Sequence, residues 1–270
     1  ALSGGFANVY RANETSQEVL AELGFAEAVV KATVLRVVEQ GVNGVTKKSV
    51  KRERKAYGLL RDLGFHRTLL FPNIVLPGKG GRGSDPLYMT MPFCDCDLTK
   101  FDFENGGQVI ELMTALADGV GHLHEHGIAH FDIKGENVLV RDKHFLLSDF
   151  GVAVKLGAAG TYNGPFAGTT GEVAPEMQEL WAGGTAELNG FKCDVFAIGK
   201  TVATCMAKGR AERLTYPVNG DFALIQALIQ SSMLSCADQR PSTKCMLDKI
   251  NTRLASGTGP VQLCLDNSLI

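Results

Sequence analysis

The sequence predicts an α+β fold in which a small, strand-rich lobe precedes a mainly helical lobe. Runs of β-branched and apolar residues bounded by glycine and proline fill the first third of the chain, as is typical of short strands. Further along, apolar residues recur at helical intervals over several long segments. The length of 270 residues fits one two-lobed domain. We expect lobes at about 1–92 and 98–256, a connection at about 92–97 and a short tail at 257–270.

The first lobe is expected to be a sheet with one helix. Strands are predicted at residues 6–11, 27–38, 74–76 and 87–93. A helix is predicted at residues 47–63, because five apolar residues of that segment gather on one side. These residues are Val50, Ala56, Leu59, Leu60 and Leu63.

The second lobe is expected to hold four long helices and one β-hairpin. The first helix covers residues 109–123 and ends before Gly127, and the others lie near residues 194–206, 222–234 and 243–254. Between the first two helices, residues 138–140 and 145–147 read as two strands joined by a tight turn. Such a hairpin folds the chain back on itself, so residues just before and just after it face the same region.

Composition narrows the class of protein. A formal net charge of −2 argues against a nucleic-acid binder dominated by phosphate contacts. The seven cysteines are scattered and form no CxxC pair, which supports neither a zinc site nor a disulfide framework. We therefore expect an intracellular, most simply cytoplasmic, location. No apolar run spans a bilayer and no leader opens the chain, which begins at Ala1; we expect an excised domain with regulatory segments outside it.

Residues 130–137 and 148–151 flank the hairpin and carry the strongest chemical signal. They contain Asp132, Lys134, Asn137 and Asp149, which together suit a phosphoryl group and its metal ions. A carboxylate such as Asp132 can orient a hydroxyl and accept its proton, while Lys134 offsets charge on the transferring phosphate. Asn137 and Asp149 offer hard oxygen ligands of the kind that Mg²⁺ prefers.

These two segments resemble the catalytic loop and the metal-binding loop of protein kinases, H-x-D-x-K-x-x-N followed by D-F-G. The resemblance implies a two-lobed protein-kinase fold and transfer of the γ-phosphoryl group of Mg-ATP to protein substrates. It makes Asp132 the catalytic base and Asn137 and Asp149 the Mg²⁺ ligands. Lysine two positions after the aspartate matches the serine/threonine class, as does Thr169.

The first lobe carries a second part of the same pattern. Lys31 lies among apolar residues in a predicted strand, where an unpaired lysine is costly to bury, and Glu53 on the following helix is its expected partner. In protein kinases such a pair holds the α- and β-phosphates of ATP. The family's glycine-rich loop is degenerate here: Gly4 is the one glycine of the pattern that remains, together with Val9, and the neighbouring Gly5 is expected to compensate. Val29 takes the place of a small residue beneath adenine.

Residues 87–94 are similar to the strand and hinge that bind adenine. Met91 would lie at the back of the pocket, the Pro92 carbonyl would accept from adenine and the Cys94 amide would donate to it. Asp97 is expected at the ribose hydroxyls, and Leu139 completes the nucleotide-binding set that the resemblance implies.

The remaining motifs indicate a protein acceptor. Residues 168–176 are similar to the end of a kinase activation segment, which disfavours a small-molecule kinase on a related fold. The resemblance pairs Glu176 with Arg240 and makes Asp194 the residue that anchors the catalytic loop. Fold alone does not settle the substrate, so this inference depends on the site.

One departure from the family concerns regulation. Phe131 stands where the family commonly has an arginine that pairs with a phosphorylated activation-segment residue. We therefore expect activity that does not need phosphorylation of Thr161, Tyr162 or Thr170. The same departure, with the altered glycine loop, leaves an alternative: a pseudokinase or scaffold that binds nucleotide or partners with little catalysis.

Overall fold

The structure is a computed structural model. It describes residues 2–3, 8–11, 33–38, 47–61, 63–72, 74–77, 87–157, 159–184, 187–208 and 221–256. Within these ranges a sheet-containing part is followed along the chain by a helical part. The predicted α+β fold class is confirmed.

An antiparallel five-stranded sheet and one helix form the first part. The elements are β1 (Leu2–Ser3), β2 (Asn8–Arg11), β3 (Thr33–Val38), α2 (Lys47–Leu60), β4 (Ile74–Pro77) and β5 (Leu87–Pro92). The strand order is β1-β2-β3-β5-β4, and Met91 pairs with Val34 in the β3–β5 ladder. The predicted 27–38 strand is described from Thr33 onward, and residues 27–32 lie outside the described part.

The helix α2 is amphipathic. Glu53, Ala56, Tyr57 and Leu60 are buried, and they recur at the helical interval of three or four residues. The helix ends at Leu60, three residues earlier than predicted, since the Leu63 amide bonds to the Leu60 carbonyl in a turn. The buried face of α2 thus carries one carboxylate, that of Glu53, among apolar side chains.

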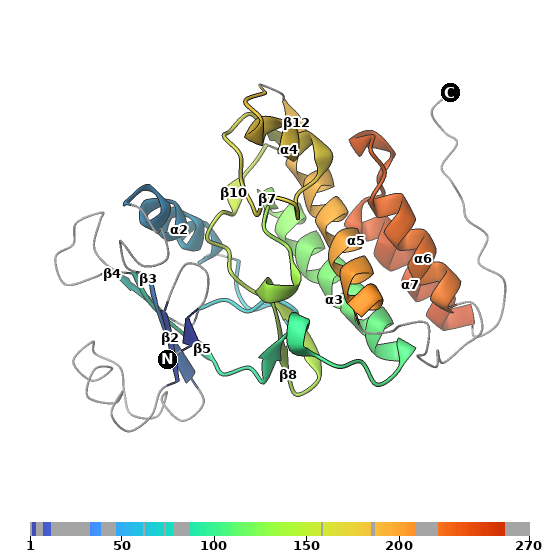
Figure 1. Cartoon of the computed structure of the whole chain (residues 1–270), viewed down its shortest axis with the longest axis horizontal. Helices are drawn as coiled ribbons and strands as arrows, with labels where there is room; N and C mark the ends of the chain where they lie inside the picture. The colour runs from blue at the N-terminus through green and yellow to red at the C-terminus, as the bar shows by residue number, and fades with distance from the viewer. Residues whose placement is uncertain are drawn as a thin grey trace.

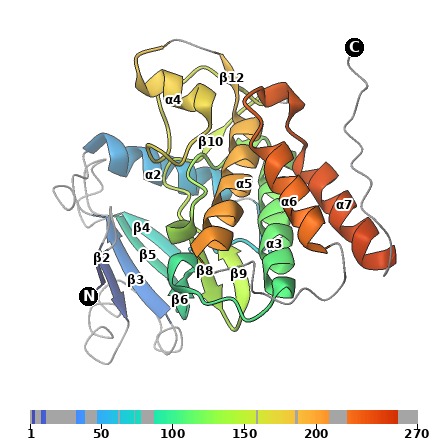
Figure 2. The same cartoon turned by 45° about the vertical axis from the view of Figure 1, so that its right-hand side comes forward.

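Helices and short strand pairs form the second part. These elements are β6 (Cys96–Asp97), η2 (Leu98–Lys100), α3 (Gly106–Glu125), β7 (Ile128–Ala129), η3 (Gly135–Asn137), β8 (Val138–Arg141), β9 (His144–Leu147), β10 (Val154–Lys155), β11 (Thr161–Tyr162), α4 (Pro175–Trp181), β12 (Leu188–Asn189), α5 (Gly190–Lys208), α6 (Asp221–Ser232), η5 (Ala237–Gln239) and α7 (Thr243–Ser256). Figures 1 and 2 both place the sheet and α2 on one side of the molecule and α3, α5, α6 and α7 together on the other.

The helical part has α3 at its centre, in contact with α5, α6 and α7. All the apolar residues on which this helix was predicted are buried: Val109, Leu112, Met113, Leu116, Val120 and Leu123. The four predicted helices are confirmed, with ends that differ from the prediction by up to four residues. The short helix α4 was not predicted.

The predicted hairpin is present as β8 and β9. Val138 pairs with Leu147 and Arg141 with His144. The two turn residues Asp142 and Lys143 have φ of 52° and 65°, the left-handed conformation that a two-residue hairpin turn requires. The hairpin therefore fixes the spacing between the segment before Val138 and the segment after Leu147.

Candidate active site

The predicted catalytic loop, residues 130–137, connects β7 to β8, and a buried carboxylate holds its backbone. Asp194 of α5 has no exposed surface. Its Oδ2 accepts from the His130 amide at 2.8 Å and its Oδ1 from the Phe131 amide at 2.8 Å. His124 of α3 lies 3.0 Å from the same Oδ2 through its Nε2. A buried carboxylate is stable only with such donors, so the predicted anchoring role of Asp194 has a direct geometric basis.

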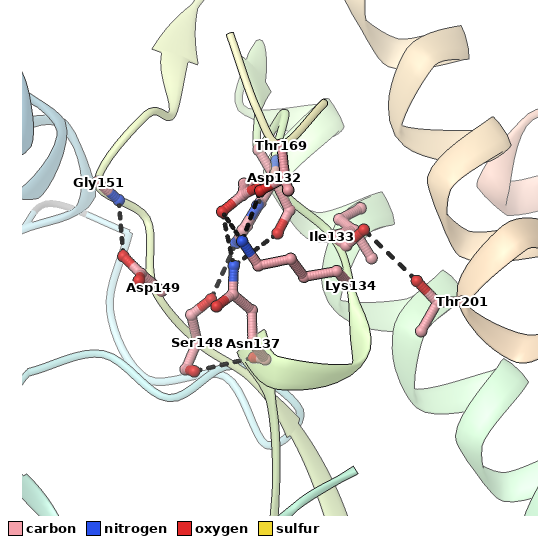
Figure 3. Close-up of polar contacts among 10 residues, drawn as sticks. Asp132, Ile133, Lys134, Asn137, Ser148, Asp149, Gly151, Thr169 and Thr201 are labelled. Atoms are coloured by element: carbon pink, nitrogen blue, oxygen red, sulfur yellow. Dashed lines mark hydrogen bonds and ion pairs between the residues drawn. The ribbon is translucent and has the colours of Figure 1, made fainter. Parts of the chain in front are cut away.

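Four side chains meet at Asp132 (Figure 3). Asp132 Oδ1 accepts from the Thr169 hydroxyl at 2.6 Å, and Asp132 Oδ2 lies 3.0 Å from Lys134 Nζ. Lys134 Nζ also donates to Thr169 Oγ1 at 2.6 Å. Asn137 Nδ2 donates to the Asp132 carbonyl at 2.7 Å and to Oδ2 at 2.9 Å. The structure thus brings together three residues of the catalytic loop and one from the predicted activation segment.

Asn137 and Asp149 lie at the open end of the β8–β9 hairpin. The Asn137 carbonyl accepts from both the amide and the hydroxyl of Ser148, each at 2.8 Å. Asp149 follows directly, with φ of 60°, and its Oδ1 accepts from the Gly151 amide at 3.3 Å. In Figure 3 Asp149 stands to one side of the group around Asp132. The contacts of Ser148 with Asn137 were not predicted from the sequence, although the position of Ser148 just before Asp149 was a usable signal.

Phe150 and Glu53 connect this site to the first part of the chain. Phe150 is fully buried, and its ring centroid lies 5.0 Å from those of Phe71 and His130. Glu53 is 5% exposed. A Cβ built on Gly151 would lie 3.4 Å from Glu53 Cδ and 3.2 Å from Asp149 Oδ1. Glu53 therefore reaches from α2 to the loop that holds Asp149.

The predicted hinge follows β5. Met91 is buried, and the Cys94 thiol lies 3.9 Å from the Pro92 carbonyl oxygen. Burial raises the pKa of Cys94 to about 11, so this thiol is neutral at physiological pH. The described geometry leaves the adenine contacts predicted at these three residues as predictions.

Asp97 has a structural task. It is the N-cap of η2 and accepts from the Thr99 amide at 3.0 Å, from the Thr99 hydroxyl, and from Lys100 Nζ at 2.5 Å. Burial alone would raise the pKa of Asp97, but the hydrogen bonds from Lys100 and Thr99 hold it below its ordinary value. Asp97 pairs with Leu139 in the β6–β8 ladder, so these two residues of the predicted nucleotide site are neighbours.

Several predicted nucleotide-binding residues cannot be placed. Gly4, Gly5, Val29 and Lys31 lie outside the described residues, and Val9 is described as backbone of β2 alone. The predicted pairing of Lys31 with Glu53 accordingly stays a prediction.

The end of the predicted activation segment is tied to the helical part. Arg240 Nη1 donates to Glu176 Oε1 at 2.6 Å and Arg240 Nη2 to Glu176 Oε2 at 2.8 Å. The predicted ion pair is therefore present in bidentate form. Burial alone would raise the pKa of Glu176, and the hydrogen bonds from Arg240 lead the effects that hold it below its ordinary value.

Comparison with known proteins identifies the family. The family model "protein kinase domain" matches residues 27–240, which is more than half of the chain. The chain belongs to the protein kinase domain family, and the predicted two-lobed kinase fold is confirmed.

Three curated relatives illustrate the similarity. The chain is 30% identical over 185 residues to the serine/threonine-protein kinase cds1 of Schizosaccharomyces pombe, covering 63% of this chain and 40% of the relative. It is 23% identical over 279 residues to serine/threonine-protein kinase D of Synechocystis, covering 96% and 52%. It is 34% identical over 137 residues to human mitogen-activated protein kinase kinase kinase kinase 3, covering 48% and 15%. The chain thus spans about half or less of these relatives' lengths.

Proposed function

We propose that this chain transfers the γ-phosphoryl group of Mg-ATP to serine or threonine hydroxyls of protein substrates. The observation that carries the proposal is the group around Asp132, in which one carboxylate contacts the Lys134 ammonium and the Thr169 hydroxyl within 3.0 Å. A base and a cation side by side suit a reaction in which a hydroxyl loses a proton while a phosphate oxygen gains charge.

The reaction can be written with the residues of this chain. The acceptor hydroxyl donates its hydrogen bond to Asp132, in the position where Thr169 donates at 2.6 Å. The hydroxyl oxygen forms a bond to the γ-phosphorus, the bond from phosphorus to the β,γ-bridging oxygen breaks, and ADP departs. The hydroxyl proton passes to Asp132, and Lys134 offsets the charge on the transferring group.

The donor set suits a magnesium ion. Both hydrogens of the Asn137 amide are directed to Asp132, which leaves the amide oxygen as the end suited to a cation. Asp149 supplies a carboxylate at the same open end of the hairpin. When bound, Mg²⁺ supplies positive charge that screens the phosphate oxygens. We assign the nucleotide contacts to Lys31, Met91, Pro92, Cys94, Asp97 and Leu139, together with Gly4, Gly5, Val9 and Val29, and we assign to Glu53 the role of holding Lys31 in place.

The serine/threonine assignment and the protein acceptor are supported from two directions. Two of the relatives above bear the name serine/threonine-protein kinase. In this chain, Thr169 of the activation segment forms hydrogen bonds with both Lys134 and Asp132. The segment expected to receive a peptide is therefore held next to Asp132, the proposed base.

A phosphate-incorporation assay with a generic protein acceptor tests the proposal. We expect Asp132→Asn to lower the rate by about 10²- to 10⁴-fold, the usual contribution of a general base. The magnesium-dependent thermal shift with ATP should persist, since Asp132 does not hold the nucleotide.

The matched control is Asp142→Asn, because Asp142 is an exposed turn residue and should leave the rate unchanged. A wild-type chain that shows the thermal shift but no incorporation would contradict the proposal and favour a nucleotide-binding scaffold.

A further inference from the structure

We propose that an aromatic contact between Phe131 and Tyr162 positions the activation segment, residues 149–176, for protein substrate without a bound phosphate. This inference rests on the proposed function, because it concerns how the same site is kept ready. It makes Phe131 and Tyr162 positioning residues, acting on substrate through Thr169 and the segment around it.

Phe131 belongs to a small apolar core. It is 4% exposed, and its ring centroid lies 4.7 Å from that of Tyr162. Its φ of 65° is unusual for a non-glycine residue, and its amide donates to buried Asp194. A strained backbone held in this way turns the ring towards the segment. Leu156 and Ala167 of the segment belong to the same core, as do Met177 and Leu188.

Tyr162 is fixed on several sides. It is 6% exposed, and its hydroxyl donates to the Pro165 carbonyl at 2.6 Å. Its backbone belongs to β11, which pairs with β12 just before α5, with Tyr162 opposite Leu188. The segment is thus joined to the helical part by a strand pair and a ring contact, and a hydrogen bond within the segment fixes the Tyr162 ring; none of the three involves a charged group.

Two glycines show how closely the chain approaches Phe131. A Cβ on Gly190 would lie 2.7 Å from Phe131 Cζ, and a Cβ on Gly168 would lie 2.3 Å from the Phe131 carbonyl oxygen. Both distances exclude a side chain. Gly168 directly precedes Thr169, so the packing at Phe131 is transmitted over one residue to the threonine that contacts Asp132.

The neighbouring cations of the helical part already have acceptors. Lys155 donates to the His126 carbonyl, Lys192 to the Arg240 carbonyl and Lys200 to the Gly171 carbonyl. Each of these three ammonium groups is thus held by a backbone carbonyl. Among the described residues, Arg52, exposed on α2, is a further cation to test, since its charge acts on Tyr162: burial raises the pKa of Tyr162, and Arg52 opposes that shift.

The experiment compares the phosphatase-treated chain with the untreated chain, and with Tyr162→Ala, Tyr162→Leu, Tyr162→Phe and Arg52→Ala. Steady-state kinetics give KM for a protein acceptor and KM for ATP separately. Hydrogen exchange measures protection of residues 159–172. Tyr162→Leu keeps apolar bulk and replaces the alanine variant if that variant does not fold.

We expect phosphatase treatment and Arg52→Ala to change neither kinetics nor exchange. Loss of the aromatic pair in Tyr162→Ala or Tyr162→Leu should raise KM for the protein acceptor by roughly tenfold, with KM for ATP unchanged and exchange of the segment faster. Tyr162→Phe keeps the ring, so KM for the protein acceptor and the hydrogen exchange of the segment should both stay close to the wild-type values. If the Tyr162 hydroxyl were what holds the segment, Tyr162→Phe would instead resemble Tyr162→Leu.

The proposal is overturned if phosphatase treatment raises exchange in the segment, or if Tyr162→Ala and Tyr162→Leu leave that exchange unchanged. Exchange is measured without any phosphate transfer. A chain that is catalytically silent but shows the expected exchange pattern would contradict the proposed function alone.

Discussion

Asp132 and Glu176 are two carboxylates that flank the last part of the activation segment, and their partners differ in kind. Their side chains are almost equally accessible, at 12% and 19%. Asp132 contacts the ammonium of Lys134, the hydroxyl of Thr169 and the amide of Asn137. Glu176 contacts a guanidinium that has no exposed surface.

The guanidinium at Glu176 is part of a closed network. Besides its two bonds to Glu176, Arg240 donates to the carbonyls of Leu234, Lys192 and Ser235, so all five of its N–H groups are used. No ligand can enter such a network without leaving a buried charge unpaired. The partners of Asp132 form no such closed network: a lysine, a threonine and an asparagine contact it. Exposure alone does not separate the proposed catalytic carboxylate from the structural one, but the nature of their partners does.

The largest effect on stability should come from Glu176→Ala. Removing one partner of a buried ion pair leaves Arg240 uncompensated, which costs about 3–5 kcal/mol. Urea unfolding followed by circular dichroism measures the loss. Glu179→Ala on the same helix is the matched control, since Glu179 is exposed and should change the free energy of unfolding by less than about 0.5 kcal/mol. A loss of unfolding free energy in Glu176→Ala no larger than that in Glu179→Ala would show that the pair with Arg240 does not stabilise the fold.

Thr169→Val should affect activity rather than stability. The substitution deletes the hydroxyl that joins Lys134 to Asp132. A hydrogen bond to a charged group contributes about 1.5–3 kcal/mol, which corresponds to a fall in kcat of roughly 10- to 100-fold when it acts in the transition state. Thr170→Val, at the exposed neighbouring threonine, serves as the control. An equal fall in kcat in both variants would show that kcat depends on the segment as a whole and not on the Thr169 hydroxyl.

The sequence predicted that Asp132, Lys134 and Asn137 lie together, because these parts of the candidate site are local. Asp132, Lys134 and Asn137 lie within six residues, and the β8–β9 hairpin that brings Asp149 back is encoded by two short apolar runs joined by a tight turn. The long α3 was equally readable, since every predicted apolar position is buried. Where one short segment determines the geometry, periodicity and turn chemistry are sufficient.

Features that depend on distant contacts were less predictable. The short helix α4 has seven residues, too few for periodicity to be visible, and it depends on the Glu176–Arg240 pair for its place. The two hydrogen bonds that Ser148 donates to the Asn137 carbonyl form only once the β8–β9 hairpin has brought these residues together. The Asp97 carboxylate caps η2, and the ribose contact predicted for it would use the same oxygens. Sequence spacing alone does not tell which of these two roles Asp97 has.

Asp97 offers a smaller and more selective test of that competition. Asp97→Ala should lower the free energy of unfolding by about 0.5–2 kcal/mol through loss of the cap, and Asp97→Ser should recover most of it. Serine is too short to keep a ribose contact, so KM for ATP should rise in both variants, by about 2- to 10-fold for one lost hydrogen bond. An unchanged KM in both would leave Asp97 as a cap and refute its predicted role at the nucleotide.

The smallest expected effect, and the most specific, is the dependence of stability on the titration of Glu176 in acid. Its pKa in the folded chain lies below the ordinary value of 4.5, so the unfolded chain binds this proton more readily than the folded chain does. The pair therefore stabilises the fold fully above pH 4.5, and that contribution is lost as the pH falls through the folded pKa. Urea unfolding at pH 7 and pH 4 should show a larger acid-induced loss for the wild-type chain than for Glu176→Gln, which cannot titrate there. Because Asp97 titrates alike in both chains, the difference between them isolates Glu176, and parallel losses would show that Arg240 does not depress the pKa of this carboxyl.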